Sequence, residues 1–336
     1  MKIFNKVSVI APARLHLGFM DLNGSLGRKF GSVGMAIDSI ETDILVSKIP
    51  LANRSDVCKN NKRAYEYAQL ILKAYELEES VSIKINKSIP EHSGLGSGTQ
   101  LALAVGSAVS KLFNLNLSLM DIGKILDRGN RSGIGIGAFE HGGFLIDGGK
   151  GKSDDLPQIT VRHNFPDNWR IVLLINQREK GLHGKKEFNA FKTLKPFPIN
   201  KAEKLCHLVN MVILPSIVEK NFRDFACGIG TLQQIVGTHF APIQGGVYSN
   251  PDISRIMKFV ENKGFTGIGQ SSWGPTGFIL TDSDTSAHNL VREIRNNFLC
   301  KDLTIDIIKG RNTGSVFKSN YKKNEIKQTN KKINKE

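Results

Sequence analysis

A glycine-rich loop in the first third of the chain combines residue types that bind phosphate. Residues 90–99 read Pro-Glu-His-Ser-Gly-Leu-Gly-Ser-Gly-Thr, between a predicted strand and a predicted helix. Glycines let the backbone approach a ligand closely, and amides at the start of a helix are unpaired and lie at the positive end of its dipole. The segment is neither a Walker loop nor a GxGxxG motif, and a plain capped turn is the alternative. We predict a phosphate or pyrophosphate site at Ser93, Gly94, Leu95, Gly96, Ser97, Gly98 and Thr99.

Two further segments carry residues suited to anions and to a flat substrate. Residues 11–19 read Ala-Pro-Ala-Arg-Leu-His-Leu-Gly-Phe, and the Arg14 guanidinium could pair with phosphate or carboxylate, or form a structural ion pair. Residues 269–277 read Gly-Gln-Ser-Ser-Trp-Gly-Pro-Thr-Gly. Trp273 could form an apolar wall for an aromatic ring or pack in the core. The polar residues before it predict either substrate contacts or a tight turn; these are Gln270, Ser271 and Ser272.

Taken together and in this order, the three segments resemble motifs of the GHMP kinase superfamily over residues 7–280. Residues 14–21, 131–137, 139–143 and 269–275 more closely resemble its β-ribofuranosylaminobenzene 5′-phosphate synthase branch. The resemblance implies condensation of phosphoribosyl pyrophosphate with 4-aminobenzoate or 4-hydroxybenzoate. It implies CO2 and pyrophosphate as by-products, Mg2+ as the metal, and a place in the synthesis of methanopterin-type carriers.

The departures from the kinase pattern favour this branch. Kinases of the superfamily usually carry a second Ser after the GLGS sequence, where this chain has Gly98, and a Lys where it has Arg14. These changes put ATP-dependent phosphoryl transfer in doubt and leave the anion site intact. An ATP-dependent small-molecule kinase nevertheless stays the alternative enzyme.

Loss of pyrophosphate from a ribose carbon builds positive charge on the sugar and negative charge on the leaving group, so fixed donors and a nearby carboxylate are expected. Arg14 is the donor candidate, and Asp21 and Glu140 are the carboxylate candidates, each with a turn or helix-start role as its alternative. His16 could contact the substrate and His141 could move a proton or orient a carboxylate, although a lone histidine more often serves packing.

Basic residues further along could hold the second substrate or cover the sugar. Arg131 and Ser132 open a glycine-rich stretch that predicts a second anion cradle. Residues 178–186 form a basic, glycine-containing segment from which Lys180 and His183 could face the phosphorylated sugar. The alternative for this segment is a solvated run of charge.

The elements that must position these residues are predicted from periodicity. Helices are expected over 60–77, 99–113, 118–128, 201–219, 221–238, 252–262 and 285–298. Strands are expected over 7–10, 44–46, 81–85, 144–147, 170–176, 265–268, 278–280 and 303–308. The order predicts an α+β protein with an N-terminal domain over 1–165, carrying the loop and a mixed sheet, and a C-terminal domain over 166–316. The resemblance implies a ferredoxin-like C-terminal domain.

Charge and composition limit the other classes of function. The chain has 336 residues and a net charge of +15, of which the Lys-rich segment 317–336 supplies seven Lys against two Glu. We expect this segment to be a disordered tail. No stretch approaches the roughly 18 apolar residues of a membrane span, and four scattered cysteines suggest reduced thiols in a cytoplasm. We therefore expect small-molecule substrates, a homodimer, and no membrane or nucleic-acid partner; a non-catalytic nucleic-acid-binding module is the second alternative.

Overall fold

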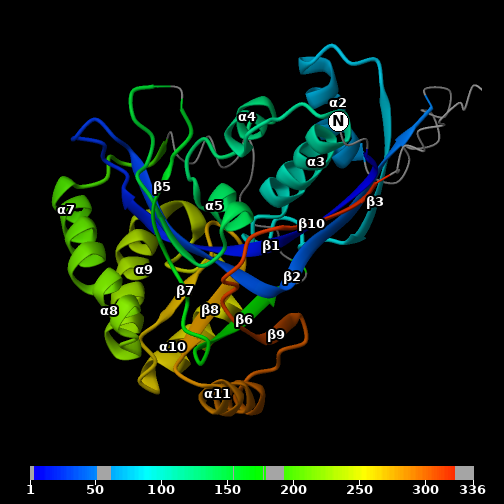
Figure 1. Cartoon of the computed structure of the whole chain (residues 1–336). Helices are drawn as coiled ribbons and strands as arrows, with labels where there is room; N and C mark the ends of the chain where they lie inside the picture. Colours follow the sequence, from blue (N-terminus) through cyan, green and yellow to red (C-terminus); the bar gives the residue numbers. More distant parts are fainter. Residues whose placement is uncertain (1–3, 51–61, 154, 177, 179–192, 322–336) are drawn as a thin grey trace, which may run out of the picture.

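The computed structural model describes residues 4–50, 62–153, 155–176, 178 and 193–321, and within them the chain builds two sheets (Figure 1). The first contains six strands in the order β10-β1-β2-β4-β5, with β3 also pairing with β2. Its strands are β1 (Phe4–Asp21), β2 (Phe30–Ile49), β3 (Ser80–Lys87), β4 (Phe144–Asp147), β5 (Ile159–His163) and β10 (Val316–Tyr321). All of these pairings are antiparallel, so the prediction of a mixed sheet was wrong.

Strand β1 contributes to two cores along its length. Val7 and Val9 are fully buried beneath helices α2 (Lys62–Ala74) and α3 (Ser97–Phe113). Leu15 and Leu17, further along, enter a second core that the two sheets share. A register shift between Pro12 and Ala13 separates these regions, because β2 contains extra residues there, and a second shift, between His16 and Gly18, places an extra residue on β1. The bulged strand thereby brings Arg14 and His16 to the junction of the two halves of the molecule.

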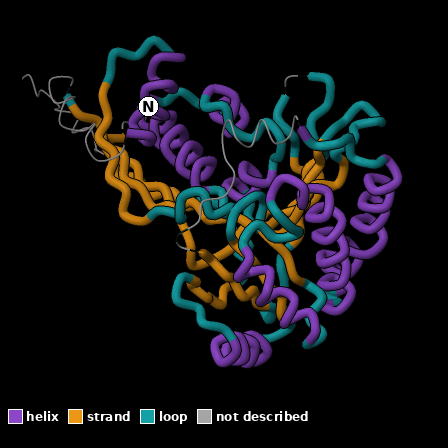
Figure 2. The backbone as a smooth tube through the Cα atoms, turned by 180° about the vertical axis from the view of Figure 1, so that it is seen from behind, coloured by secondary structure: helices purple, strands orange, loops and turns teal. Residues whose placement is uncertain are grey.

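Helices cover one side of the first sheet, and Figure 2 shows them from behind. The apolar residues of α2 follow helical spacing and are buried: Ala64, Tyr67, Ala68, Ile71 and Leu72. Helix α4 (Leu119–Ile125) begins at the predicted Ser118 cap, which forms a capping box with Asp121. A short helix, α5 (Ile134–Glu140), follows in the glycine-rich stretch, where none was predicted.

The second sheet has the order β7-β8-β6-β9 and pairs antiparallel throughout. Its strands are β6 (Arg170–Asn176), β7 (Ile268–Gln270), β8 (Thr276–Thr281) and β9 (Leu303–Ile308). The helices of this half are α7 (Ile199–Leu208), α8 (Leu214–Glu219), α9 (Phe222–Gln244), α10 (Pro251–Asn262) and α11 (Asp284–Asn297). In chain order the strands lie 4-1-3-2, with helices after the first and third, so the predicted ferredoxin-like topology is confirmed.

The helix predicted over 201–219 is interrupted as Pro215 requires. Helix α7 ends at Leu208, a π-helical segment spans Val209–Ile213, and α8 begins with Pro215 in its first turn. Proline has no N–H to donate to the preceding turn, so a wider turn before it avoids an unpaired carbonyl within a regular helix.

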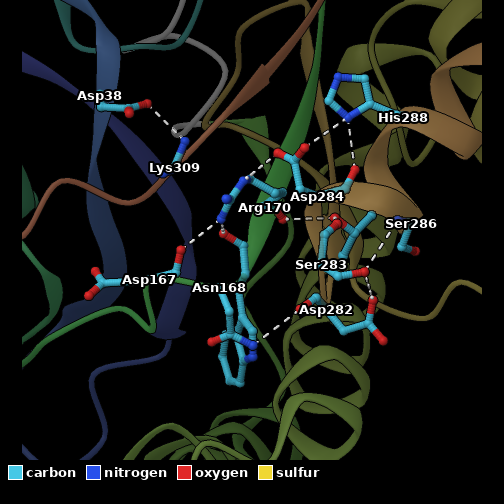
Figure 3. Close-up of polar contacts among 12 residues, drawn as sticks. Asp38, Asp167, Asn168, Arg170, Asp282, Ser283, Asp284, Ser286, His288 and Lys309 are labelled. Carbon is cyan, nitrogen blue, oxygen red and sulfur yellow. Dashed lines mark hydrogen bonds and ion pairs between the residues drawn. The ribbon is translucent and has the colours of Figure 1, made fainter.

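Polar contacts fix the second sheet to α11 and to the first half (Figure 3). Arg170 Nε lies 2.9 Å from Asp284 Oδ1 in the first turn of α11, and His288 Nδ1 lies 3.2 Å from the other oxygen of that carboxylate. After β9 the chain crosses back, because the Lys309 amide donates to Asp38 Oδ1 at 2.8 Å and the Asp38 amide donates to the Lys309 carbonyl.

The expected tail was placed wrongly at its start. Residues 316–321 form β10, which pairs antiparallel with β1 from Ile10–Val316 to Phe4–Tyr321. Phe317 packs edge-on against Phe139 and beneath the Lys111 ammonium, so this segment makes apolar contacts that its Lys-rich composition did not indicate.

The expected boundary at residue 165 falls between β5 of the first sheet and β6 of the second. No helix within the described ranges is long and apolar enough to cross a bilayer.

Candidate functional site

The glycine-rich loop, residues 93–99, ends in the first turn of α3. Gly94 and Gly96 have φ angles of 84° and 88°, a left-handed backbone that favours glycine. Gly96 is the N-cap of α3, and within the described ranges no side-chain hydrogen bond caps this helix start. The amides of the first turn, from Ser97 to Thr99, are half-buried and carry the positive end of the α3 dipole. The predicted anion site therefore has the required backbone geometry.

All three sequence motifs meet at one carbonyl oxygen in this loop. The Gly94 oxygen accepts a hydrogen bond from Arg14 Nη1 of β1 and another, at 2.7 Å, from Ser271 Oγ of the C-terminal motif. The same Ser271 Oγ accepts from the His16 amide at 3.1 Å, and the Ser272 amide donates to the His16 carbonyl at 3.2 Å. The motifs thus hold one another through backbone groups.

Close backbone contact between the loop and the C-terminal motif requires glycine on both sides. A Cβ on Gly94 would collide with the Ser271 carbonyl, and a Cβ on Gly274 would collide with the Ser93 carbonyl. Ser93 itself is buried and donates to the Pro90 carbonyl at 2.8 Å. Ser93 therefore shapes the turn, and its hydroxyl is occupied within the protein.

Arg14 lies alongside the loop as predicted. Its side-chain atoms Cγ, Nε and Cζ lie 3.2–3.4 Å from the position that a Cβ on Gly96 would occupy. The Arg14 amide donates to the Leu95 carbonyl at 3.1 Å. The guanidinium therefore adds positive charge next to the uncapped amides of α3, which favours a phosphate or pyrophosphate there.

A second arginine, which sequence analysis missed, lies at Gly98. Arg63, from the first turn of α2, places Nη2 2.5 Å from where a Cβ on Gly98 would stand. Its Nε donates to Tyr67 Oη at 2.9 Å, and Arg128 Nη2 donates to the same oxygen at 2.8 Å. The available signal was the glycine at position 98, which departs from the kinase pattern.

His16 is buried, with 4% of its surface exposed, and its Nε2 has no hydrogen-bond partner in the described part of the chain. Burial, with a smaller contribution from the Arg14 charge, lowers the pKa of His16 to about 3, so the ring is neutral near pH 7. It faces a small cavity shared with Ser272 and Trp273. The cavity measures about 30 Å³, enough for one water, so an aryl ring would need neighbouring side chains to move.

The predicted substrate contacts in the C-terminal motif have mostly structural partners. Gln270 accepts from the Ser249 amide at 2.7 Å and donates to the Ser272 carbonyl at 3.1 Å. Trp273 is 5% exposed and packs against Phe240 with ring centroids 4.4 Å apart. Trp273 thus belongs to the core in this state, whereas Ser272 is half-buried beside His16.

The predicted second cradle lies beside the loop and is organised by a buried carboxylate. Asp147 accepts hydrogen bonds from Ser32, from Ser132 Oγ at 3.2 Å and from the Gly133 amide at 2.9 Å. Burial raises the pKa of Asp147, while these donors oppose the shift. The first turn of α5 contacts the loop helix, because Gln100 Nε2 donates to the Gly135 carbonyl at 2.8 Å. Arg131 and Ser132 precede that turn and are half-buried.

Three predicted catalytic residues lie away from the loop. Asp21 stabilises a turn by accepting hydrogen bonds from the Asn23 and Gly24 amides. It lies seven residues along β1 from Arg14, which corresponds to about 20 Å in an extended strand. Glu140 and His141 end α5, are exposed, and pair with each other at 3.4 Å. Along their helix, Glu140 lies about 8 Å beyond the contact that Gly135 makes with the start of α3. No hydrogen bond or ion pair among the described residues connects any of the three to residues 93–99. Lys180 and His183 fall outside the described residues.

A cleft of about 640 Å³, which Ser93 also lines, opens between the two sheets. Asn176 and Thr304 line it from the second half, and Glu41, Lys87 and Glu91 line it from the first. Within the described ranges, no three His, Cys, Asp or Glu side chains gather as a metal site. Glu91 is the carboxylate that belongs to the loop segment itself.

Comparison with known proteins identifies the architecture. The model for the GHMP kinases N terminal domain matches residues 62–143, and the model for the GHMP kinases C terminal domain matches residues 213–299. Solved structures with a similar fold include mevalonate diphosphate decarboxylase from Enterococcus faecalis, with a TM-score of 0.66, 16% identity, and coverage of 94% of this chain and 99% of that one. Homoserine kinase from Cytophaga hutchinsonii gives a TM-score of 0.64 and 17% identity, covering 93% and 97%.

Curated relatives are more similar in sequence. A beta-ribofuranosylphenol 5′-phosphate synthase from Methanocaldococcus jannaschii is 39% identical over 304 residues, which cover 81% of this chain and 88% of that protein. A protein of the same name from Archaeoglobus fulgidus is 33% identical over 320 residues, covering 90% and 96%. A 4-diphosphocytidyl-2-C-methyl-D-erythritol kinase from Bacillus licheniformis is 23% identical over 305 residues, covering 88% and 93%.

Proposed function

The chain belongs to the β-ribofuranosylphenol 5′-phosphate synthase family within the GHMP kinase superfamily, and on that premise we propose that it is a decarboxylating phosphoribosyltransferase. The donor is 5-phosphoribosyl 1-pyrophosphate and the acceptor is 4-hydroxybenzoate or 4-aminobenzoate. The products are an aryl C-riboside 5′-phosphate, CO2 and pyrophosphate, an early step toward methanopterin-type carriers.

The bonds in this reaction balance without another reactant. The C1–O bond of ribose breaks, and its electron pair leaves with the pyrophosphate. The ring carbon that carries the carboxylate forms the new C–C bond to C1. The bond to the carboxylate then breaks, its electron pair restores the aromatic ring, and CO2 leaves. The protein must therefore stabilise a departing polyanion next to a cationic sugar.

One observation carries the proposal: the uncapped first turn of α3 and the Arg14 guanidinium converge at Gly96. The amides of residues 97–99 and Arg14 would hold the pyrophosphate as negative charge develops on it. Ser271 would keep the loop in place through its bond to the Gly94 carbonyl. These groups suit an anion that forms during the reaction, because they are fixed before the substrate binds.

We propose that the benzoate acceptor binds beside the neutral His16 ring and Ser272. Arg131 and Ser132, which precede the first turn of α5, are proposed as further contacts to it. A neutral imidazole could hydrogen-bond the hydroxyl at position 4 without adding charge. The ribofuranosylphenol in the relatives' name favours 4-hydroxybenzoate over 4-aminobenzoate. For the ring to enter, Trp273 or Phe240 must move, since their present packing leaves room for one water.

Mg2+ is proposed as the metal. Magnesium is commonly bound through substrate phosphates with one or two carboxylates, so a site with no cluster of three protein ligands among the described residues fits an ion that arrives with the pyrophosphate. Glu91 is the carboxylate that could ligate it from the loop segment. The ion would neutralise charge on the leaving group. Lys180 and His183 stay proposed contacts to the sugar, and the homodimer and cytoplasmic location stay predictions.

The proposal is tested by the stoichiometry of products. Purified protein with phosphoribosyl pyrophosphate, Mg2+ and 4-hydroxybenzoate should release CO2 and pyrophosphate in a 1:1 ratio and form an aryl riboside phosphate by mass spectrometry. A parallel incubation with MgATP and small alcohols should show no ADP formation. Absence of CO2 and pyrophosphate with either benzoate would refute the transferase, and ADP formation would favour the kinase alternative.

A further inference from the structure

The glycine at position 98 makes room for an arginine at the start of α3. Arg63 Nη2 lies 2.5 Å from the position of a Cβ on that residue, closer than real Cβ contacts allow. A serine there would displace the guanidinium. Arg14 lies against Gly96 and Arg63 lies against Gly98, so both guanidinium groups approach the start of the same helix.

Arg63 belongs to a cluster with Tyr67 and Arg128. Both guanidinium groups donate to Tyr67 Oη, at 2.9 and 2.8 Å, and both lie over its ring with centroid distances of 5.8 and 5.5 Å. The Tyr67 side chain is 5% exposed, so it fixes both cations in place. Arg128 Nε is buried and has no hydrogen-bond partner among the residues that the structure describes.

The charge of this cluster is poorly compensated. Glu91 is the carboxylate paired with it among the described residues, 4.0 Å from Arg63 Nη1; the Arg63 side chain is 37% exposed and the Glu91 side chain 63%. Such an exposed, long ion pair contributes little. Two guanidinium groups that share one neutral oxygen beside a helix N-terminus therefore form a site that favours an additional anion.

We propose that Arg63 and Arg128 bind the 5′-phosphate of the donor substrate. The inference rests on the proposed function, which requires one molecule with two anionic groups separated by a ribose. The pyrophosphate lies with Arg14 and the amides of the loop, and the monophosphate lies with the Arg63–Tyr67–Arg128 cluster. The arginines hold and orient the donor, and the reacting carbon lies between the two sets of cations.

The proposal also accounts for the departure from the kinase motif. With glycine at position 98, Arg63 reaches the loop, whereas a side chain there would direct it away. The change from serine to glycine and the presence of Arg63 are thus one structural feature. The proposal therefore predicts that substitutions at positions 63 and 98 have non-additive effects on binding.

Calorimetric titration tests the assignment with three ligands in the presence of Mg2+: phosphoribosyl pyrophosphate, ribose 5-phosphate and inorganic pyrophosphate. In Arg63→Gln and Arg128→Gln we expect the affinity for phosphoribosyl pyrophosphate and for ribose 5-phosphate to fall about tenfold or more, as for loss of a charged hydrogen bond. The affinity of these variants for inorganic pyrophosphate should change less than about threefold. Arg292→Gln, which changes an exposed arginine on α11, is the matched control and should change none of the three affinities.

Coupling is tested with Gly98→Ala, which adds the Cβ without adding charge. We expect this variant to weaken 5′-phosphate binding as Arg63→Gln does, and the double variant to be no weaker than Arg63→Gln alone. Since the atom displaced is the far end of a flexible side chain, the fold should be retained, and a thermal melt checks this.

The outcomes separate this inference from the proposed function. An equal loss for pyrophosphate and for the 5′-phosphates would overturn it, because the arginines would then serve the loop. Unchanged affinities in both arginine variants, or additive effects of Gly98→Ala and Arg63→Gln, would overturn it as well, even if the wild-type protein catalyses the reaction. Failure of the wild-type protein to bind phosphoribosyl pyrophosphate would instead refute the proposed function.

Discussion

The hydroxyl of Ser271 donates to the carbonyl oxygen of Gly94 across 2.7 Å, although the two residues are 177 positions apart in the chain. Gly94 lies in the loop of the N-terminal half, and Ser271 follows β7 of the ferredoxin-like half. Arg14 donates to the same oxygen from β1. The bond therefore connects the two halves of the molecule at the site proposed to hold pyrophosphate, and it makes loop geometry dependent on their packing.

Replacing Ser271 with Ala should destabilise the protein and weaken donor binding. The change removes the bond to Gly94 and leaves the buried His16 amide without its acceptor, which costs about 1–3 kcal/mol. Chemical denaturation and the KM for phosphoribosyl pyrophosphate measure the two effects. Ser216→Ala is the control, because that buried hydroxyl bonds to the nearby Ile213 carbonyl. If Ser271→Ala raises KM no more than Ser216→Ala does, Ser271 has no role in placing the loop.

Gly96→Asp should abolish activity while leaving the fold intact. The new carboxylate would stand beside Arg14 and repel the pyrophosphate, lowering donor affinity on the order of 100-fold, since like-charge contacts cost several kcal/mol. The left-handed φ adds a stability cost of about 1–2 kcal/mol.

Gly264→Asp provides the matched control for this variant. Gly264 has a φ of 90° and no atoms within 4 Å of the position that a Cβ would occupy, so the substitution adds the same charge and backbone cost away from the loop. We expect similar melting temperatures for the two variants and normal activity for Gly264→Asp. A fully active Gly96→Asp would contradict the loop assignment.

Burial of His16 predicts a specific dependence of stability on pH. Its pKa is lowered to about 3 in the folded protein, so the unfolded chain binds one more proton between that value and its ordinary 6.5. Stability relative to His16→Gln should therefore be constant above pH 6.5 and fall by about 1.4 kcal/mol per pH unit below it. Denaturation of both proteins from pH 4.5 to 8 measures the difference. A difference that does not vary with pH would show that His16 is not buried as described.

The pairing of β10 with β1 predicts that two C-terminal truncations will differ in melting temperature. Removing 316–336 deletes the strand paired with β1 and the Phe317 contact with Phe139, so the melting temperature should fall by at least about 4 °C. Removing 322–336 takes away most of the tail lysines and should leave stability and turnover unchanged. Equal melting temperatures for the two truncated proteins would contradict the pairing of β10.

Most regular elements could be predicted from the sequence because their apolar spacing is set by burial on one face. Helix α2 and the Ser118 cap of α4 are examples. Helix α5 could not, since Gly135 and Gly137 oppose helix formation and tight packing against Thr99 and Ile159 requires them. The full lengths of β1 and β2 were hidden by bulges that interrupt the alternation.

The site was predictable in its backbone and less so in its side chains. The glycine pattern identified the loop, because glycine is required by left-handed angles and by contact with Gly274. The partners of individual polar groups depend on distant chain segments. Gln270 therefore appeared free in the sequence but bonds Ser249 in the structure. Arg63 gave no local signal, since it lies at the start of an ordinary amphipathic helix.

A crystal structure with phosphoribosyl pyrophosphate and Mg2+ bound tests the central claim most directly. The account predicts that the pyrophosphate accepts hydrogen bonds from the amides of residues 97–99 and lies against the Arg14 guanidinium. Pyrophosphate bound in the cleft beside Glu41 and Lys87, with these amides making no contact with the ligand, would contradict it.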